Sequence, residues 1–213
     1  MPKVDYALMF VTDDSIKDDN TFFAILEAAL QGGATIIQLR EKTLDTLSFY
    51  NRALRGKELC SNYGIPLIIN DSLDIALAID ADGVHIGQAD MPYDVARRLM
   101  GNGKIIGLSV SSTEQAVQLN AQAADYIGIS PIFSTNTKTT DLAQPLGISG
   151  LKAIRELYSK PIVCIGGIHK ANTKEIIENG ADGIAVVSAI SKAANPEAAT
   201  KELKEIICKT GIN

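Results

Sequence analysis

Residues 66–90 read PLIINDSLDIALAIDADGVHIGQAD, and this stretch decides the fold. Two short apolar runs, Pro66-Leu67-Ile68-Ile69 and Gly83-Val84-His85-Ile86, each stop at polar residues and are typical of buried strands. Between them, apolar residues recur at helical spacing from Leu73 to Ile79. A strand, a helix and a second strand in this order predict a crossover connection, which makes the two strands parallel.

A carboxylate lies just past each of these strands, because Asp71 follows the first and Asp90 follows the second. Neighbouring parallel strands lie about 4.8 Å apart and end at the same edge of a sheet, so we expect the two side chains to converge. A pair of hard oxygen ligands suits Mg²⁺ that holds a phosphate substrate. The sequence therefore predicts a magnesium site with Asp71 and Asp90 as its protein ligands.

The start of the second strand belongs to a phrase that recurs along the chain. Ala81-Asp82-Gly83-Val84 is matched by Gly33-Ala34-Thr35-Ile36, Ala124-Asp125-Tyr126-Ile127 and Ala181-Asp182-Gly183-Ile184, with room for two strand–helix units in each interval. Further apolar runs fill these intervals and precede them, at residues 4–11, 66–69, 104–109 and 161–165. Eight alternating units predict a (β/α)8 TIM barrel that forms a single domain over residues 1–213. A doubly wound open sheet uses the same unit and is the competing fold.

Apolar stripes with a period of about 3.6 residues predict the helices that cover the barrel. The clearest stripe spans residues 22–30 and ends at Gly32-Gly33, which is the usual position of a C-terminal glycine cap. The other stripes lie within residues 47–63, 95–100, 116–123, 151–158, 176–177 and 198–207.

Composition limits the classes of function. The chain has 213 residues, of which 46% are hydrophobic and 21% charged, enough for one full core. A formal net charge of -5 argues against nucleic-acid binding, which usually needs a basic face. We see neither a signal peptide nor an apolar run of transmembrane length, so we expect a cytoplasmic protein with small-molecule ligands. Cys60, Cys164 and Cys208 are expected to be reduced structural thiols.

Polar residues after the other strands carry the functional prediction, because active sites of such barrels lie where the strands end. Gln38 and Arg40 share one face of the run Gln38-Leu39-Arg40-Glu41-Lys42 and are predicted to point into the mouth, the alternative being a solvated charge run. Ser109 ends a strand and is either a site hydroxyl or simply a helix-cap or turn residue. Residues 130–140 form a hydroxyl-rich loop with Lys138, which suits a diphosphate under a movable lid or is an ordinary surface loop.

Backbone amides after the last two strands predict a second anion site. Paired glycines in Ile165-Gly166-Gly167-Ile168 allow close approach of a phosphate, and a helical turn begins within Val186-Val187-Ser188-Ala189-Ile190. Two phosphorylated ligands would then face each other across the mouth. His85 is expected to be a satisfied core or rim histidine, and His169 to face solvent. The sequence offers no Ser-His-Asp or Cys-His cluster, so positioning and charge stabilisation must supply the catalysis.

Along the chain stand the motifs Gln-Leu-Arg-Glu-Lys, Asn-Asp, Gly-Val-His-Ile-Gly-Gln-Ala-Asp, Thr-Asn-Thr-Lys, Ile-Gly-Gly-Ile and Val-Ser-Ala-Ile. In their order and spacing they resemble the motifs of thiamine phosphate synthases. The resemblance covers nearly the whole chain. It implies a transferase that joins 4-amino-2-methyl-5-(diphosphomethyl)pyrimidine to 4-methyl-5-(2-phosphoethyl)thiazole, or its carboxylated form, with Mg²⁺ as cofactor. It also implies a dissociative step, in which diphosphate leaves first and the aminopyrimidine stabilises a methylene cation until the thiazole nitrogen attacks.

The resemblance also implies roles for individual residues. It places Asp71 and Asp90 on Mg²⁺, with Lys138, Arg40 and Ser109 as the catalytic residues. The substrate contacts that it implies are Gln38, Arg40, Lys42, Asn70, Ser109 and Lys138 for the pyrimidine diphosphate, and Thr135, Thr137, Gly167, Val187 and Ser188 for the thiazole phosphate.

Two other functions are compatible with the same sequence. A thiazole tautomerase of this fold binds the thiazole phosphate but needs no diphosphate or metal site, and a thiamine-precursor binding protein turns over nothing. Retention of Asp71, Asp90 and Lys138 favours the synthase. We expect neither nucleic acid nor a membrane as a partner, and the sequence leaves homo-oligomer formation open.

Overall fold

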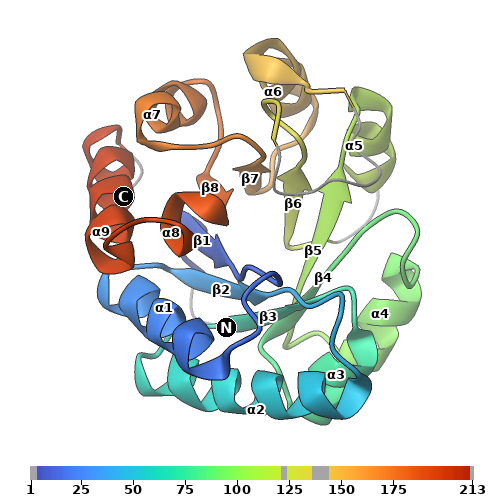
Figure 1. Ribbon diagram of the computed structural model, residues 1–213. Coiled ribbons are helices and arrows are strands. Elements are labelled where there is room, and N and C mark those ends of the chain that lie inside the picture. Colours follow the sequence, from blue (N-terminus) through green and yellow to red (C-terminus); the bar gives the residue numbers. More distant parts are fainter. Residues whose placement is uncertain (1–3, 121–123, 136–143, 212–213) are drawn as a thin grey trace.

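The computed structural model describes residues 4–120, 124–135 and 144–211. Eight strands form a closed barrel in which each strand pairs with its neighbours in chain order (Figure 1). The barrel closes because β8 pairs in parallel with β1, through Leu8 opposite Ile184 and Phe10 opposite Val186. The predicted (β/α)8 barrel is therefore confirmed, and the open sheet is wrong because its first and last strands would not pair.

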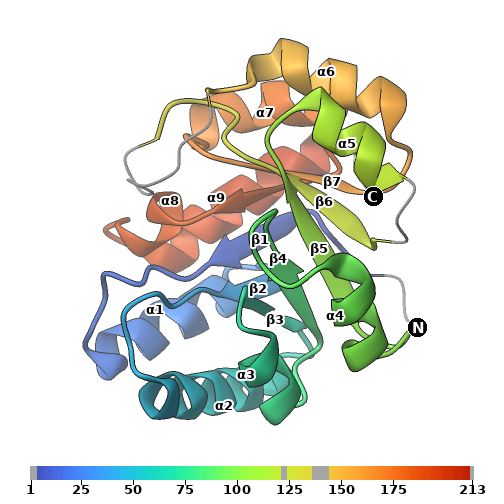
Figure 2. The ribbon, with the colours of Figure 1, turned by 90° about the vertical axis from the view of Figure 1, so that its right-hand side faces the viewer.

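Strands and helices alternate along the chain, and the helices ring the barrel (Figures 1 and 2). The strands are β1 Leu8–Val11, β2 Ile36–Leu39, β3 Leu67–Asn70, β4 Gly83–Ile86, β5 Ile105–Val110, β6 Tyr126–Ile129, β7 Ile162–Ile165 and β8 Gly183–Val186. The helices are α1 Asp19–Gln31, α2 Thr46–Asn62, α3 Leu73–Ala78, α4 Tyr93–Met100, α5 Thr113–Asn120, α6 Gly147–Leu157, α7 Lys170–Glu178, α8 Ser188–Ser191 and α9 Pro196–Lys209.

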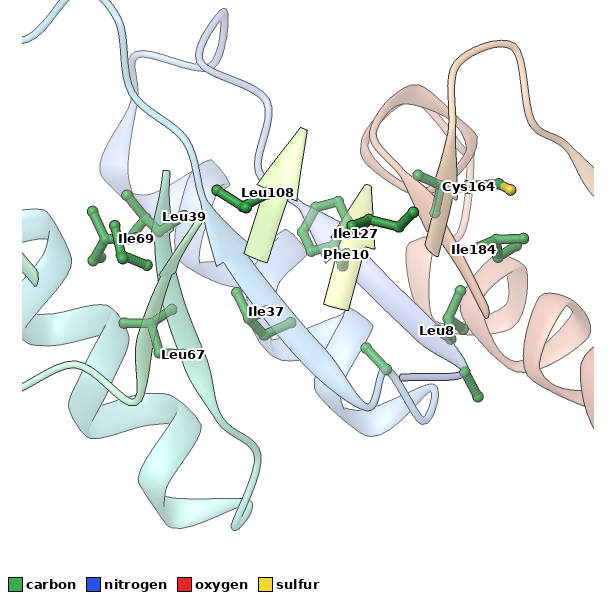
Figure 3. Close-up of a cluster of buried hydrophobic side chains, with 14 of the residues drawn as sticks. Leu8, Phe10, Ile37, Leu39, Leu67, Ile69, Leu108, Ile127, Cys164 and Ile184 are labelled. Atoms are coloured by element: carbon green, nitrogen blue, oxygen red, sulfur yellow. The ribbon is translucent and has the colours of Figure 1, made fainter. Parts of the chain in front are cut away.

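Two apolar layers hold the barrel together, because successive strand residues point to opposite sides. Outward-facing residues such as Phe10, Ile37 and Ile127 pack between the strands and the surrounding helices (Figure 3). Inward-facing residues form a separate cluster inside the barrel, made of Met9, Val11, Ile36, Ile68, Ile105, Tyr126, Val163 and Ala185. Strands that are buried on both faces explain why the sequence shows continuous apolar runs rather than clean alternation.

The recurring phrase has a structural cause at the end of the barrel where strands begin. Its polar residue accepts a hydrogen bond from a backbone N–H of the neighbouring strand. Leu8 N–H donates to Thr35 Oγ1 (3.0 Å). In the same way the N–H groups of three other residues donate to an aspartate Oδ2 at 2.8 Å, in the pairs Leu67 with Asp82, Ile106 with Asp125 and Ile162 with Asp182. Each carboxylate also pairs with a helix cation, namely Lys57 (2.6 Å), Arg97 (2.6 Å) and Arg155 (2.8 Å) respectively. The phrase therefore marks where adjacent strands are locked in register.

Helix boundaries follow the apolar stripes, with one informative difference. Helix α1 starts after Asp18, whose carboxylate accepts from Thr21 N–H (2.8 Å), and ends as predicted, with Gly33 in the left-handed region (φ 97°). Helix α6 begins at Gly147, ahead of the stripe that starts at Leu151.

Cys60 and Cys164 are buried free thiols, but Cys208 is exposed, so it does not pack in the core. In the described residues, no helix has the length and apolar character to cross a membrane.

Candidate active site

The C-terminal ends of the strands bring Asp71 and Asp90 to one side of the barrel mouth. Asp71 follows β3 directly and adopts a left-handed backbone conformation (φ 63°), with its N–H donating to His85 O (2.8 Å). Asp90 lies in the loop after β4, where its Oδ2 accepts from Gly87 N–H (2.7 Å). The backbone of the strand ends thus holds Asp71 through its N–H group and Asp90 through its carboxylate.

The two carboxylates meet, as the sequence predicts. Burial raises the pKa of Asp90, the Gly87 N–H opposes this, and the hydrogen bond and negative charge of Asp71 raise it further. Lys42 Nζ forms an ion pair with Asp71 Oδ2, so one cation already balances part of this charge. Two adjoining carboxylates that repel each other fit a hard divalent cation such as Mg²⁺. In the described part of the chain they do not belong to any cluster of three or more His, Cys, Asp or Glu with metal-binding geometry.

The run after β2 divides between the barrel interior and its mouth. Gln38 is buried and points inward, with Nε2 3.3 Å from Met9 Sδ. Arg40 pairs with Asp14 of the loop after β1 (2.7 Å), and Lys42 reaches Asp71. The inward orientation of Gln38 agrees with the alternation, and the shared face of Gln38 and Arg40 stays a prediction. The solvated charge run is wrong for Gln38, which is buried.

Glu41 is a buried member of the same run whose role the sequence does not reveal. Its Oε1 accepts from the N–H groups of Lys42 (3.0 Å) and Thr43 (3.0 Å), and its Oε2 pairs with Arg52 Nη1 of α2 (3.0 Å). Burial disfavours the charged form, yet the Thr43 hydrogen bonds and the charge of Lys17 hold the pKa of Glu41 below its usual value. Arg52 also donates to Asp19 (2.9 Å) at the start of α1. This buried pair fixes the loop that carries Arg40 and Lys42.

Polar side chains also line the barrel interior below the mouth. His85 on β4 lies between Tyr126 on β6 (Nδ1 to Oη, 2.8 Å) and Ser109 on β5 (Nε2 to Oγ, 2.9 Å). Burial lowers the pKa of His85 to about 4. The expectation of a satisfied core or rim histidine is confirmed. Ser109 is not a helix cap, because its hydroxyl faces His85 inside the barrel.

The opposite side of the mouth carries backbone groups after β7 and β8. Gly166 and Gly167 both have left-handed φ angles, of 103° and 65°. A Cβ on Gly167 would lie 2.6 Å from Ser134 O and 2.8 Å from Phe133 Cβ, so the glycine is also needed for the packing of the loop after β6. Ser188 opens α8, and this short helix is tied to the loop after β1 by Ser191 Oγ donating to Asp13 Oδ2 (2.9 Å).

Comparisons with known proteins agree with this architecture. The family model described as thiamine monophosphate synthase (TMP-TENI) matches residues 8–190, from the first strand to α8. The chain belongs to this family. A thiamine-phosphate synthase of Chloroflexus aurantiacus is 47% identical over 207 residues, covering 97% of this chain and 95% of the relative. One from Clostridium novyi is 44% identical, covering 95% and 99%.

Solved structures of related and unrelated sequence share the barrel fold of this thiamine monophosphate synthase family member. A thiamine phosphate pyrophosphorylase from Pyrococcus furiosus superposes with a TM-score of 0.88 at 37% identity, covering 97% of this chain and 98% of that one. An orotidine 5'-phosphate decarboxylase from Pyrococcus horikoshii has a TM-score of 0.70 at 17% identity, covering 94% and 99%. The second likeness is to the barrel fold alone.

Of the residues that resemblance to the thiamine monophosphate synthase family singles out, Lys42, Asp71 and Asp90 lie together. Asn70, at the end of β3, lies beside His85 of β4 in the strand register. Thr135 is half-buried after β6, and Val187 precedes α8. Thr137 and Lys138 lie outside the described residues. Asp13, Asp14, Glu41, Arg52 and Tyr126 were not predicted as site residues, and only their contacts reveal them.

Proposed function

We propose that this member of the thiamine monophosphate synthase family joins 4-amino-2-methyl-5-(diphosphomethyl)pyrimidine to 4-methyl-5-(2-phosphoethyl)thiazole, or its carboxylated form, and releases diphosphate. The observation that carries the proposal is the convergence of Asp71, Asp90 and Lys42 at the mouth of a barrel whose relatives are named thiamine-phosphate synthases. A tautomerase would need no such arrangement of two carboxylates and a lysine.

Asp71 and Asp90 are the residues that would hold Mg²⁺, which when bound neutralises charge on the diphosphate. Lys42 lies next to them, and Arg40 follows the same strand, so both can bind phosphate oxygens. When diphosphate binds, the Lys42–Asp71 and Arg40–Asp14 pairs supply the two cations. The anion therefore binds where positive charge is already positioned by carboxylates.

Gln38 and Ser109 orient the pyrimidine ring below the mouth, and the amides near Gly167 and Ser188 hold the phosphate of the thiazole. The methylene C–O bond breaks with its electron pair going to diphosphate, and the thiazole nitrogen then forms the new C–N bond. Lys138 contacts the departing diphosphate, whose charge grows as the bond breaks. The proposed reaction therefore needs neither a nucleophilic side chain nor a general base.

The direct test is incubation of the purified protein with both phosphorylated precursors and Mg²⁺. We expect thiamine phosphate to form and EDTA to stop its formation. A tautomerase would instead convert a thiazole phosphate tautomer without Mg²⁺, and a binding protein would retain ligand without product. Absence of thiamine phosphate with folded protein contradicts the proposal.

A further inference from the structure

Four polar side chains form one hydrogen-bonded chain inside the barrel. Gln38 contacts Met9 Sδ (3.3 Å) and the hydroxyl of Tyr126, Tyr126 reaches His85 (2.8 Å), and His85 reaches Ser109 (2.9 Å). Its two ends, Gln38 and Ser109, are the residues proposed to contact the pyrimidine ring. Its two middle members, Tyr126 and His85, contact neither substrate in the proposed reaction.

The barrel is built to accommodate the two middle rings. A Cβ on Gly107 would collide with the ring of Tyr126, and a Cβ on Gly128 would lie 2.9 Å from His85 Cε1. The ring of Tyr126 also packs against that of Tyr6 in a tilted arrangement, with ring centroids 5.1 Å apart. Both rings are therefore fixed by packing, and their polar atoms have a single arrangement.

Met9 sets the direction of the hydrogen bonds. A thioether sulfur accepts hydrogen bonds but cannot donate them, so Gln38 turns Nε2, and not Oε1, toward Met9. A side-chain hydrogen bond from Gln38 opposes the rise in the pKa of Tyr126 that burial causes, which is the effect of an amide N–H donated to the phenolic oxygen, so the one proton of Tyr126 is then available for His85 Nδ1. His85 is buried and neutral, so its own proton lies on Nε2 and is donated to Ser109 Oγ.

The direction of the chain decides what its two ends offer to a ligand. Both N–H groups of Gln38 are used, which leaves Oε1 as an acceptor. Ser109 accepts from His85, which leaves its hydroxyl proton for donation. We propose that Tyr126 and His85 are positioning residues that fix Gln38 as an acceptor and Ser109 as a donor, so that the site selects a ring with an exocyclic amino N–H and an unprotonated ring nitrogen.

This inference rests on the proposed function for the identity of the ligand. A 4-aminopyrimidine matches the pattern, because its amino group donates and its ring nitrogens accept. The corresponding 4-oxo ring, in its N–H form, offers the reverse pattern and would place acceptor against acceptor and donor against donor. Sites that read hydrogen bonds in this way discriminate strongly, because a mismatch leaves buried polar groups unpaired.

The tautomer of His85 tests the direction of the chain without any substrate. We expect ¹⁵N NMR of the whole protein at neutral pH to show His85 protonated on Nε2 and bare on Nδ1. The chain has two histidines, so a His169→Gln variant assigns the signals. Protonation on Nδ1, with Nε2 bare, would reverse every bond in the chain and overturn the proposal.

Ligand binding tests the positioning role with two matched Tyr→Phe variants. Tyr126→Phe removes the link between Gln38 and His85, whereas Tyr158→Phe removes a buried hydroxyl that has no partner in the described residues. We expect Tyr126→Phe to weaken binding of the 4-aminopyrimidine diphosphate by about 10- to 100-fold and to shrink its preference over the 4-oxo analogue. Inorganic diphosphate with Mg²⁺ should bind equally well to both variants.

The outcomes separate this inference from the proposed function. Equal weakening of inorganic diphosphate and the aminopyrimidine ligand would mean that Tyr126 is merely structural, which overturns the positioning role. An unchanged preference for the amino over the oxo ring in Tyr126→Phe would also overturn it. If the protein binds neither pyrimidine ligand but His85 has the expected tautomer, the proposed function fails while the chain direction stands.

Discussion

Glu41→Gln is the sharpest test of how the barrel positions its diphosphate-binding cations. Glu41 and Arg52 are almost fully buried, with side-chain exposures of 1% and 3%. The Gln side chain keeps the shape and one acceptor for the N–H groups of Lys42 and Thr43, but it removes the charge that balances Arg52. An uncompensated guanidinium then stays in the interior beside an amide that carries its own donors.

The expected cost follows from this burial. Removing one partner of a buried ion pair commonly costs about 3–5 kcal/mol, because the remaining charge is left unpaired. Arg52 retains Asp19 as a second, more exposed partner, so we expect the lower end, about 3 kcal/mol. For a chain of this size that corresponds to a fall in Tm of about 6–12 °C. Because the loop carrying Arg40 and Lys42 loosens, diphosphate binding should weaken as well.

Chemical denaturation, with calorimetric titration of diphosphate and Mg²⁺, measures both effects. Glu205→Gln is the matched control, because Glu205 pairs with Lys209 on the surface with exposures of 53% and 77% and should change stability by less than about 0.5 kcal/mol. If Glu41→Gln is as stable as this control, the buried pair does not hold the loop.

The same variant has a defined pH dependence. The folded protein lowers the pKa of Glu41, so the ionised carboxylate contributes stability that is fully present above the unfolded pKa of about 4.3. That contribution is lost as the pH falls through the lower folded pKa. The difference in unfolding free energy between wild type and Glu41→Gln should therefore shrink below about pH 4. A difference that stays constant from pH 7 to pH 3 would contradict this reasoning.

The remaining predictions concern the two anion sites. Asp71→Asn or Asp90→Asn should weaken Mg²⁺-dependent diphosphate binding and leave the fold intact, since Asn tolerates the left-handed backbone at position 71 and can accept the Gly87 hydrogen bond at position 90; activity that survives EDTA would refute the metal role. Gly167→Val should weaken thiazole phosphate binding more than diphosphate binding, because its Cβ would push against Ser134 and strain the backbone; calorimetry showing equal losses would mean that the sites are not separate. Lys138→Ala should lower kcat by about 10²–10³-fold with a smaller change in KM; wild-type single-turnover rates would remove the lysine from the mechanism.

The sequence predicts the barrel well because each strand is an apolar run and every second strand carries a further mark. Alternate strands begin with the recurring phrase, whose Thr35, Asp82, Asp125 and Asp182 accept a hydrogen bond from the neighbouring strand. The strand ends follow from the runs, so the convergence of Asp71 and Asp90 could also be predicted. These features are local in sequence, or one strand–helix–strand unit apart.

The contacts that the sequence does not reveal depend on how separate elements pack against one another. Ser191 donates to Asp13 across the closure of the barrel, and Arg52 of α2 reaches back to Glu41 and to the start of α1. Glu41 sits in a run that reads equally well as solvated charge, and only its burial distinguishes the two. Tyr126 reads as an apolar strand residue, because the space made by Gly107 and the hydrogen bond to His85 exist only once β4, β5 and β6 are adjacent.

A quenched single-turnover reaction tests the central claim most directly, because it measures both products in the same sample. Wild-type protein in excess over the pyrimidine diphosphate, with thiazole phosphate and Mg²⁺, should yield thiamine phosphate and diphosphate in equal amounts, and Asp71→Asn should slow both to the same extent. Diphosphate released without thiamine phosphate, or neither product from folded wild-type protein, would contradict a synthase whose two anion sites face each other across the barrel mouth.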